Sequence, residues 1–508
     1  MMSKLSKNII YNLFGQGLLL ILGFVAVKYV FSRLGEDALG IIYFTLMMNS
    51  ILCAVLEMGI CSTTTREVAA YFKDDPEHIH NLIRTASLLY WGTYVLLAAS
   101  IYLAAPVLVE RWINLKTLDA ATATYVLRIM GIAAALTLPQ RFYASLFRGL
   151  QRMEFNNVID VAIMGLQQFG MILILVLGGD LFYVVYWFAV CFGFSILMYL
   201  FASAHFFSWR ILIPGYSSAV IKRTFWFSLN MMSISILAMI HTQADKVIVS
   251  KLLPLGIFGY YGVAYGAVSR GTLVTGAISQ AAFPSLSVQF KTGDRVGFMS
   301  QYRKLQDLFC FATVPMFGAI PFAAVPLFTY LFNAEAARML LLPTTFLCVG
   351  YYMSATVNAP YFVSLAMGKS EITARSTFYA LFVVLPVTIA LVYFFGLTGA
   401  GLSWVFYHMF YYAYGVPRIC SECLEITVSG WYRHVLKIHV LVGLTYGFAW
   451  AFLGFLGANS IHALVLAYLG ATVMFMLGAY WLMGEELKTA LWRLLQTLRI
   501  RSAEVSPK

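Results

Sequence analysis

A single arginine, Arg270, lies near the middle of an apolar run that covers residues 257–282. Placing a cation at the centre of a membrane helix costs roughly 2.5–3.5 kcal/mol of insertion free energy. Such a residue is therefore expected to have a partner of opposite charge or to face a hydrated cavity. A guanidinium in that position can bind an anionic group through paired N–H donors. The competing interpretation is a structural ion pair with a buried carboxylate, for which Glu57 is the first candidate.

Carboxylates also occur in apolar runs. Glu57 lies deep in the second long apolar run of the chain and Asp160 near the start of the fifth. A carboxylate in a surrounding of low dielectric constant can exchange protons near neutral pH, as proton coupling requires. Glu57 could instead neutralise a neighbouring arginine, and Asp245 stands beside Lys246, which suggests local neutralisation. We expect no bound cofactor, but coupling to H⁺ or Na⁺ at Glu57, Asp160 and Asp245.

The composition determines which kind of scaffold holds these residues. Of 508 residues, 61 % are hydrophobic and 11 % charged, and the mean hydropathy is +0.80. A soluble protein carries about 25 % charged residues, and a disordered chain carries more. The seven cysteines are odd in number and lie mostly in apolar runs, so they predict no disulfide framework. The chain is predicted to be a polytopic membrane protein.

Fourteen apolar segments are each long enough to cross a bilayer as a helix, which takes about 20 residues. They cover residues 8–33, 40–64, 83–105, 122–144, 155–178, 181–206, 225–250, 257–282, 305–332, 339–366, 376–396, 398–417, 438–456 and 460–483. The expected fold is therefore all-α, with about fourteen transmembrane helices. Pro315, Pro321 and Pro326 should bend or break the ninth of them, because proline lacks the backbone donor.

The net charge of +12 is distributed unevenly along the chain. With a cytoplasmic N-terminus, and with residues within three positions of a span end counted in the adjoining loop, 25 of the 34 Lys and Arg residues fall in cytoplasmic segments and five in outer loops. This asymmetry is typical of the positive-inside rule and predicts that both termini are cytoplasmic. The charge therefore indicates topology rather than nucleic-acid binding. Residues 485–508 are predicted to form a basic amphipathic tail on the anionic inner leaflet.

An internal repeat divides the chain. Lys28 matches Lys246 at an offset of 218 residues, and Gly40 matches Gly259 at an offset of 219. The offset spans six membrane segments, an even number, so the halves should be parallel repeats about an axis along the membrane normal. We expect two six-helix lobes, two further helices and a basic cytoplasmic tail, at residues 1–215, 216–420, 421–484 and 485–508.

Short motifs along the first eight spans resemble a known family. RLGEDALG at residues 33–40, LEMGI at 56–60 and TREVA at 65–69 resemble the opening of bacterial polysaccharide-export flippases of the O-antigen type. DKVIV at 245–249, leading into YYGVA at 260–264, resembles the seventh and eighth spans of that family. The family belongs to the superfamily that also contains the multidrug/cation antiporters.

The resemblance implies a flippase of the bacterial cytoplasmic (inner) membrane, not an enzyme. Its cargo would be an undecaprenyl-pyrophosphate-linked oligosaccharide, moved to the outer leaflet for surface polysaccharide synthesis by alternating access of two lobes around a basic cavity. Its partners would be the lipid bilayer, a glycan polymerase and other polysaccharide assembly proteins, and no nucleic acid.

Under this interpretation a set of cations would bind the pyrophosphate. The candidates are Arg270, Arg66, Lys28, Lys246, Arg141 and Arg148. Snorkelling to the membrane interface would explain Lys28 and Lys246 without a function. Arg66, Arg141 and Arg148 could equally be ordinary positive-inside residues.

Two other function classes remain open. A multidrug/cation antiporter would favour an acidic cavity, whereas the mid-membrane charges here lean basic. A membrane-embedded glycan polymerase or ligase would need a long ordered outer loop, and the outer loops are short.

Two further motifs are not assigned a function. Cys420, Cys423, His434 and His439 have a spacing close to that of a zinc finger, but His439 begins a membrane span, so we expect no metal. His78 and His80 are expected to be a solvated loop pair.

The topology can be tested by labelling. Single cysteines at Gly179, Thr398 and Asn459 should react with an impermeant thiol reagent applied from outside, whereas cysteines at His80, Gln151 and Gly293 should not. Labelling of both sets from one side would contradict the fourteen-span topology and the parallel repeat.

Overall fold

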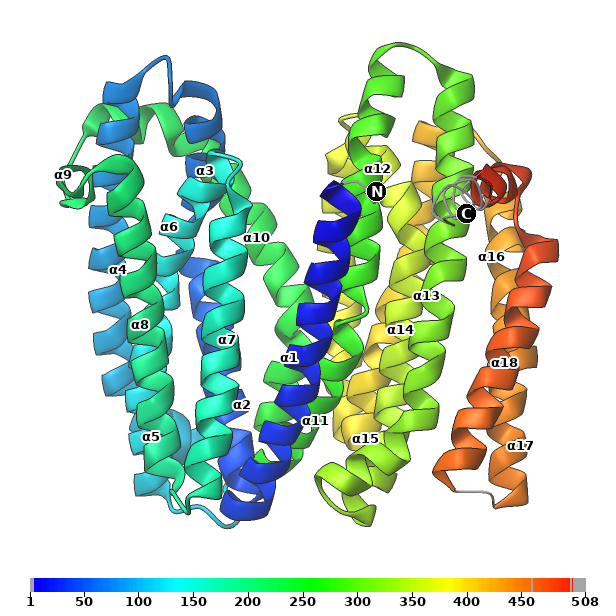
Figure 1. Cartoon of the computed structure of the whole chain (residues 1–508), viewed down its shortest axis with the longest axis horizontal. Helices are drawn as coiled ribbons and strands as arrows, with labels where there is room; N and C mark the ends of the chain where they lie inside the picture. The colour runs from blue at the N-terminus through cyan, green and yellow to red at the C-terminus, as the bar shows by residue number, and fades with distance from the viewer. Residues whose placement is uncertain (1–3, 458–459, 494–495, 497–508) are drawn as a thin grey trace, which may run out of the picture. The chain divides into compact units, whose positions relative to one another are not determined.

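The computed structural model describes residues 4–457, 460–493 and 496, and over these residues the chain is helical with no β-strand (Figure 1). The chain divides into two compact units, residues 1–263 and 264–508. The expected all-α membrane fold is confirmed. The division into lobes at residues 215 and 216 stays a prediction.

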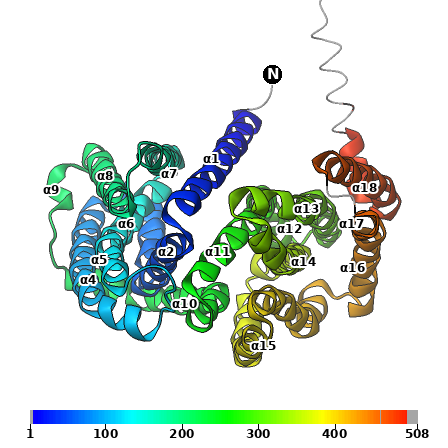
Figure 2. The same ribbon diagram turned by 90° about the horizontal axis from the view of Figure 1, so that it is seen from below.

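Unit 1 contains ten helices and the start of an eleventh within its described residues. They are α1 (Lys4–Leu34), α2 (Glu36–Leu56), α3 (Ile60–Tyr71), α4 (Pro76–Arg111), α5 (Ala120–Ala135), α6 (Thr137–Gly149), α7 (Met153–Val176), α8 (Leu181–Phe207), α9 (Trp209–Leu212), α10 (Ser218–Leu252) and α11 (Leu255–Ser269). Figure 2 shows α4, α5, α6 and α8 clustered end-on, and Tyr90, Phe142, Tyr143 and Tyr199 are buried in this cluster. α10 packs against α2, α3 and α4.

Unit 2 begins in the last turns of α11. Its described helices are α12 (Thr272–Lys291), α13 (Arg295–Leu331), α14 (Ala334–Ala366), α15 (Ser370–Ile419), η1 (Cys420–Leu424), α16 (Val428–Val442), η2 (Gly443–Gly447), α17 (Phe448–Leu456) and α18 (Ile461–Leu482). α13, α14 and α15 pack in sequence, and α16 and α18 contact α13. A further helical stretch covers residues 485–493, and the rest of the predicted tail lies outside the described residues except for residue 496.

Within the described residues, twelve helices are long and apolar enough to cross a membrane, against fourteen expected segments. Two local features explain the difference. The eighth segment is divided at Arg270 and Gly271, between α11 and α12. The eleventh and twelfth segments are joined in the 50-residue α15, whose direction changes at Gly396, with φ 56° and ψ −132°. Only glycine adopts that conformation readily, so the turn between the two spans needs almost no loop.

The three prolines of the ninth segment do not break it. α13 runs without interruption from Arg295 to Leu331 through Pro315, Pro321 and Pro326. Prolines are tolerated in membrane helices where neighbouring groups satisfy the backbone. In the same stretch, the hydroxyl of Tyr468 on α18 donates a hydrogen bond to the Pro315 carbonyl at 3.1 Å, which ties α13 to its neighbour.

The first turn of α2 holds the loop that follows α4. One carboxylate oxygen of Asp37 accepts hydrogen bonds from the backbone N–H groups of Lys116, Thr117 and Leu118, at 2.8, 2.6 and 3.1 Å. Asp37 is 1 % exposed. A run of consecutive N–H groups favours an anion, so the loop is held by one side chain.

Helices α2 and α11 cross with almost no space between their backbones. A Cβ on Gly259 would lie 2.9 Å from the Gly40 nitrogen, and a Cβ on Gly40 would lie 2.2 Å from the Leu255 carbonyl oxygen. Gly40 and Gly259 are the repeat-equivalent positions found in the sequence. Both must lack a side chain because the partner at each contact is backbone, which cannot rotate away.

Gly40→Ala tests this crossing. The added methyl group should overpack the α2–α11 contact and lower stability by about 1–3 kcal/mol, measured as a lower melting temperature of the detergent-purified protein. The control is Gly92→Ala on α4, where no atom lies within 4 Å of the new methyl group and alanine favours the helix. A Gly40→Ala protein that melts like the Gly92→Ala protein would contradict the close crossing.

Candidate functional site

Arg270 lies at the break in the eighth membrane segment. α11 ends at Ser269 and α12 begins at Thr272. The intervening turn has 3₁₀-type backbone hydrogen bonds between residues three apart, from Gly271 N to Val268 O at 3.0 Å and from Leu273 N to Arg270 O at 3.1 Å. A tightened stretch inside a helix often marks a functional hinge. The side chain is half-buried and makes no hydrogen bond or ion pair within the part of the chain that the structure describes.

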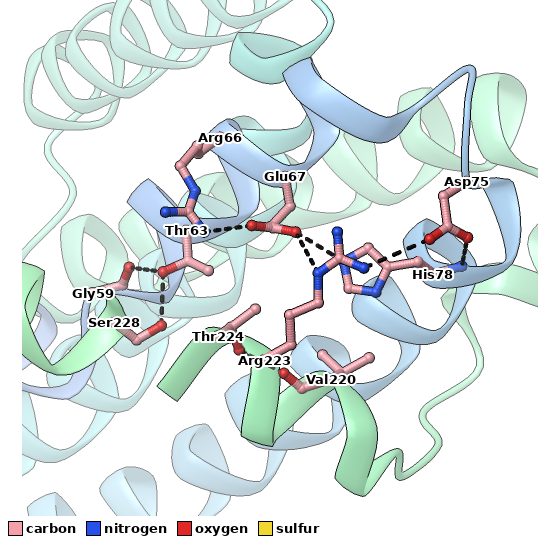
Figure 3. Close-up of polar contacts among 10 residues, drawn as sticks. All are labelled: Gly59, Thr63, Arg66, Glu67, Asp75, His78, Val220, Arg223, Thr224 and Ser228. Atoms are coloured by element: carbon pink, nitrogen blue, oxygen red, sulfur yellow. Dashed lines mark hydrogen bonds and ion pairs between the residues drawn. The ribbon is translucent and has the colours of Figure 1, made fainter. Parts of the chain in front are cut away.

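Arg66 belongs to a polar cluster that sequence reasoning missed (Figure 3). At its centre is Glu67 on α3, whose side chain is 2 % exposed. One carboxylate oxygen accepts from Arg66 at 2.6 Å, and the other accepts from His78 on α4 at 2.9 Å and lies 3.5 Å from the Arg223 guanidinium on α10. Glu67 thus joins three helices of unit 1.

The two arginines of this cluster are fixed from more than one side. The Arg66 guanidinium lies 3.8 Å from the centroid of the Phe227 ring, and that of Arg223 lies 4.4 Å from the Tyr71 ring. Arg223 also approaches Asp75, the residue that caps α4, at 3.6 Å. Both arginines remain more than a third exposed, so part of each guanidinium faces outward.

His78 is a correction to the expectation of a solvated loop pair. It lies in the first turn of α4, and its side chain is only 8 % exposed because it is turned onto Glu67. The local sequence offers one usable signal, since Asp75 followed by Pro76 predicts the start of a helix there. Nothing in the sequence indicates that Glu67 or Arg223 would meet it.

Glu67 is ionised at neutral pH. Burial raises the pKa of its carboxyl, but the hydrogen bonds from Arg66 and His78 and the nearby positive charges outweigh burial and hold the pKa below the ordinary value. The cluster therefore carries a fixed negative charge between three basic side chains. Its contribution to stability is present above the ordinary carboxyl range and is lost as the pH falls through the lowered pKa.

The remaining expected cations near this end of unit 1 differ in their partners. Arg141 on α6 lies 3.5 Å from Glu57, at the end of α2. Glu57 therefore has an arginine partner, as the neutralisation alternative required. Arg148, also on α6, is exposed, and its side chain has no hydrogen bond or ion pair among the described residues. Asp160 on α7 accepts a hydrogen bond from the Tyr199 hydroxyl at 2.9 Å.

Lys246 and Asp245 interact directly although they are adjacent on α10. The Lys246 ammonium donates to Asp245 at 3.1 Å and to the Thr242 carbonyl at 2.5 Å, and Asp245 accepts from the Tyr261 hydroxyl at 2.6 Å. Both charged residues are buried, so Lys246 does not snorkel to the interface. Lys28, its repeat equivalent on α1, is half-buried.

The zinc-like spacing does not produce a cluster of ligands. Among the described residues, no group of three or more His, Cys, Asp or Glu side chains is placed to hold a metal ion. His434 pairs with Asp307 at 2.8 Å, and the His439 ring bonds to the Val435 carbonyl of its own helix.

Glu67→Gln tests the cluster. Removing the charge leaves Arg66 and Arg223 without their anion, so stability at pH 7 should fall by about 1–3 kcal/mol, read as a lower melting temperature. As the pH falls from about 4.3, the ordinary value for glutamate, to the lowered pKa of Glu67 in the fold, the difference should shrink, because the carboxylate is protonated first in the unfolded chain and then in the folded protein. Glu77→Gln, an exposed carboxylate on α4, is the control and should melt like the wild type at both pH values.

Comparisons with known proteins agree with this architecture. A family model described as "Polysaccharide biosynthesis protein" matches residues 5–289, more than half of the chain. A putative O-antigen transporter from Shigella flexneri is 21 % identical over 404 residues, which cover 78 % of this chain and 93 % of the relative.

Solved structures share the fold at low sequence identity. The lipid II flippase MurJ in an inward closed conformation matches with a TM-score of 0.69 and 14 % identity, over 92 % of this chain and 98 % of that one. An inward-facing multidrug resistance MATE transporter of the MOP superfamily matches with a TM-score of 0.65 and 14 % identity, over 79 % and 95 %. The fold is that of transporters and flippases rather than of enzymes, and the chain belongs to the polysaccharide biosynthesis protein family of multi-pass membrane proteins.

Proposed function

We propose that this protein is a flippase that moves an undecaprenyl-pyrophosphate-linked oligosaccharide from the cytoplasmic to the outer leaflet of a bacterial inner membrane. Both termini would lie in the cytoplasm, and the transported unit would be used for surface polysaccharide. The proposal draws on the family membership, on the O-antigen transporter relative and on the charge placement.

The observation that carries the proposal is Arg270. It is a half-buried cation at a break in a membrane segment, and its guanidinium has no anionic partner within the described residues. Such a charge in a membrane is expected to serve a ligand or an ion pathway. A pyrophosphate supplies two adjacent groups of anionic oxygens, which suit the fork of guanidinium N–H donors.

Proton or sodium coupling would fall on a carboxylate that can change its charge state. Glu57 lies beside the Arg141 guanidinium and Asp245 beside Lys246, so each of these carboxylates already has a basic partner. Asp160 is bonded to the neutral phenol of Tyr199. We therefore rank Asp160 ahead of Glu57 and Asp245 as the coupling residue.

Arg270→Ala tests the cargo assignment. The loss of a charge-assisted interaction of about 1.5–3 kcal/mol should weaken pyrophosphate binding by roughly 10- to 100-fold. Surface polysaccharide should disappear while lipid-linked units accumulate on the inner leaflet. Arg270→Lys should keep partial export, because a point charge still attracts phosphate but lacks the two-pronged donor.

Membrane abundance separates binding from structure in this experiment. Because Arg270 has no ion-pair partner among the described residues, Arg270→Ala should insert at the wild-type level. Arg128→Ala is the matched control. Arg128 is also an arginine within a membrane segment, but it bonds to the Tyr102 carbonyl at 3.0 Å, and its loss should spare export. Normal export by a well-expressed Arg270→Ala protein would refute the role of Arg270.

A further inference from the structure

A cavity of about 280 Å³ opens in unit 2 where α13, α16 and the segment after α18 meet. Charged and titratable side chains from all three elements line it, namely Arg303 and Asp307 on α13, His434 on α16 and Glu486 after α18. None of them belongs to the site described above.

Asp307 joins the three elements. Its side chain is 6 % exposed, and one oxygen lies 2.8 Å from Nε2 of His434. The other oxygen accepts a hydrogen bond from the backbone N–H of Gly484 at 2.6 Å. A single carboxylate on α13 therefore holds both α16 and the segment that follows α18.

The approach of that segment depends on a glycine. A Cβ at Gly484 would lie 3.1 Å from the Asp307 carboxylate and 3.0 Å from that of Glu486. With no side chain at this position, the backbone can donate directly to Asp307. The two carboxylates are thereby brought to the same side of the cavity.

Among the side-chain types that line this cavity, histidine is the one that ordinarily changes its charge near neutral pH. Arg303 on α13 is paired with Glu486 at 3.2 Å, and the phenol of Tyr302, which also lines the cavity, is uncharged near neutrality. Near the same elements, Lys488 is paired with Glu485 at 3.0 Å, and Arg295 with Glu425 at 3.3 Å. Arginine, lysine and glutamate side chains do not ordinarily change charge over the range in which a histidine titrates.

We propose that Asp307 and His434 form a proton-binding site that controls how the last helical hairpin docks on α13. The His434 side chain is 32 % exposed, so water in the cavity reaches it. A proton from that water adds to the imidazole, and the only new covalent bond is an N–H bond. The imidazolium then faces a carboxylate oxygen 2.8 Å away, and the attraction between opposite charges strengthens the contact.

The residue before Asp307 makes further hydrogen bonds to α14 and α16. Gln306 donates to the Thr356 carbonyl on α14 at 2.9 Å and accepts from the Trp431 indole on α16 at 3.2 Å. The chain that follows α16 also lines an apolar cavity of about 190 Å³ with α13 and α14. Tighter docking of α16 at low pH would therefore act on the wall of this second cavity.

A double-mutant cycle at two pH values tests the site. The variants are His434→Gln, Asp307→Asn and the double substitution, and the measurement is the melting temperature of the full-length protein in detergent at pH 6 and pH 8.5. The energetic coupling between the two residues should be large at pH 6 and at least halved at pH 8.5, because only the imidazolium is attracted by the carboxylate. The wild type should lose roughly 1–2 °C relative to His434→Gln over this range, because the shift per unit of free energy is small in a chain of 508 residues.

A control separates this histidine from the others. His462→Gln removes an exposed histidine from α18 and should leave the wild-type pH dependence intact. His78 also pairs with a carboxylate in unit 1, so the comparison is made between variants rather than on the wild-type curve alone. Equal coupling at both pH values, or loss of the pH effect in His462→Gln, would overturn the proposal.

A second variant covers the case in which Asp307→Asn does not fold. His434→Lys carries a positive charge over the whole range, so its melting temperature should change between pH 6 and pH 8.5 only as much as that of His434→Gln, with the other histidines contributing equally to both. A His434→Lys protein that follows the wild-type pH dependence would also overturn the proposal. Melting requires no cargo, so this result is independent of whether the protein exports a lipid-linked glycan.

Discussion

Hydrocarbon cannot solvate an ionised side chain, and this constraint accounts for how charges are held in the described helices. Lys246 turns back onto Asp245 and its own helix, although adjacent helical side chains do not normally face each other. Glu57 lies beside Arg141 at the end of α2. In that setting Arg270 needs an explanation, because it is placed at a break within a membrane segment and its side chain has neither a hydrogen bond nor an ion pair in the described residues.

Buried carboxylates join segments that are far apart in sequence. Glu67 holds α3 to α4 and α10, Asp307 holds α13 to α16 and to the segment after α18, and Asp37 holds α2 to the loop after α4. In each case the cost of burying the charge is offset by two or more donors from other segments. Helix packing in a membrane gains little from the hydrophobic effect, because lipid tails are as apolar as the side chains. Hydrogen bonds and ion pairs of these buried carboxylates therefore help to determine which helices pack together.

The fold could largely be predicted from the sequence, because a bilayer forces long apolar segments to be helical. The sequence also predicted the repeat. It could not predict that the eighth segment breaks at Arg270, since no proline marks the place, nor that α13 would continue through three prolines. These outcomes depend on which neighbouring helices satisfy the backbone.

The candidate site was only partly predictable. Residue type and position identified Arg270, Arg66 and Glu57 as charges of interest. The partners came from tertiary packing, since Glu67 meets an arginine 156 residues away and Asp307 a histidine 127 residues away. Charge pairing at such separations has no local signature, because hydropathy and spacing describe one segment at a time.

The contact between Gly40 and Gly259 bears on how such a chain arose. In a symmetric dimer, a residue on the two-fold axis meets its own copy, and the interface is made of the same surface used twice. Here the two copies are repeat-equivalent positions of one polypeptide, and they touch at the backbone. A half-length chain that paired with itself through this glycine would make the same contact, and joining two such copies into one chain would keep it. In a single chain a substitution at Gly40 does not change Gly259, so the two halves can diverge in sequence, whereas one substitution in a symmetric dimer changes both copies.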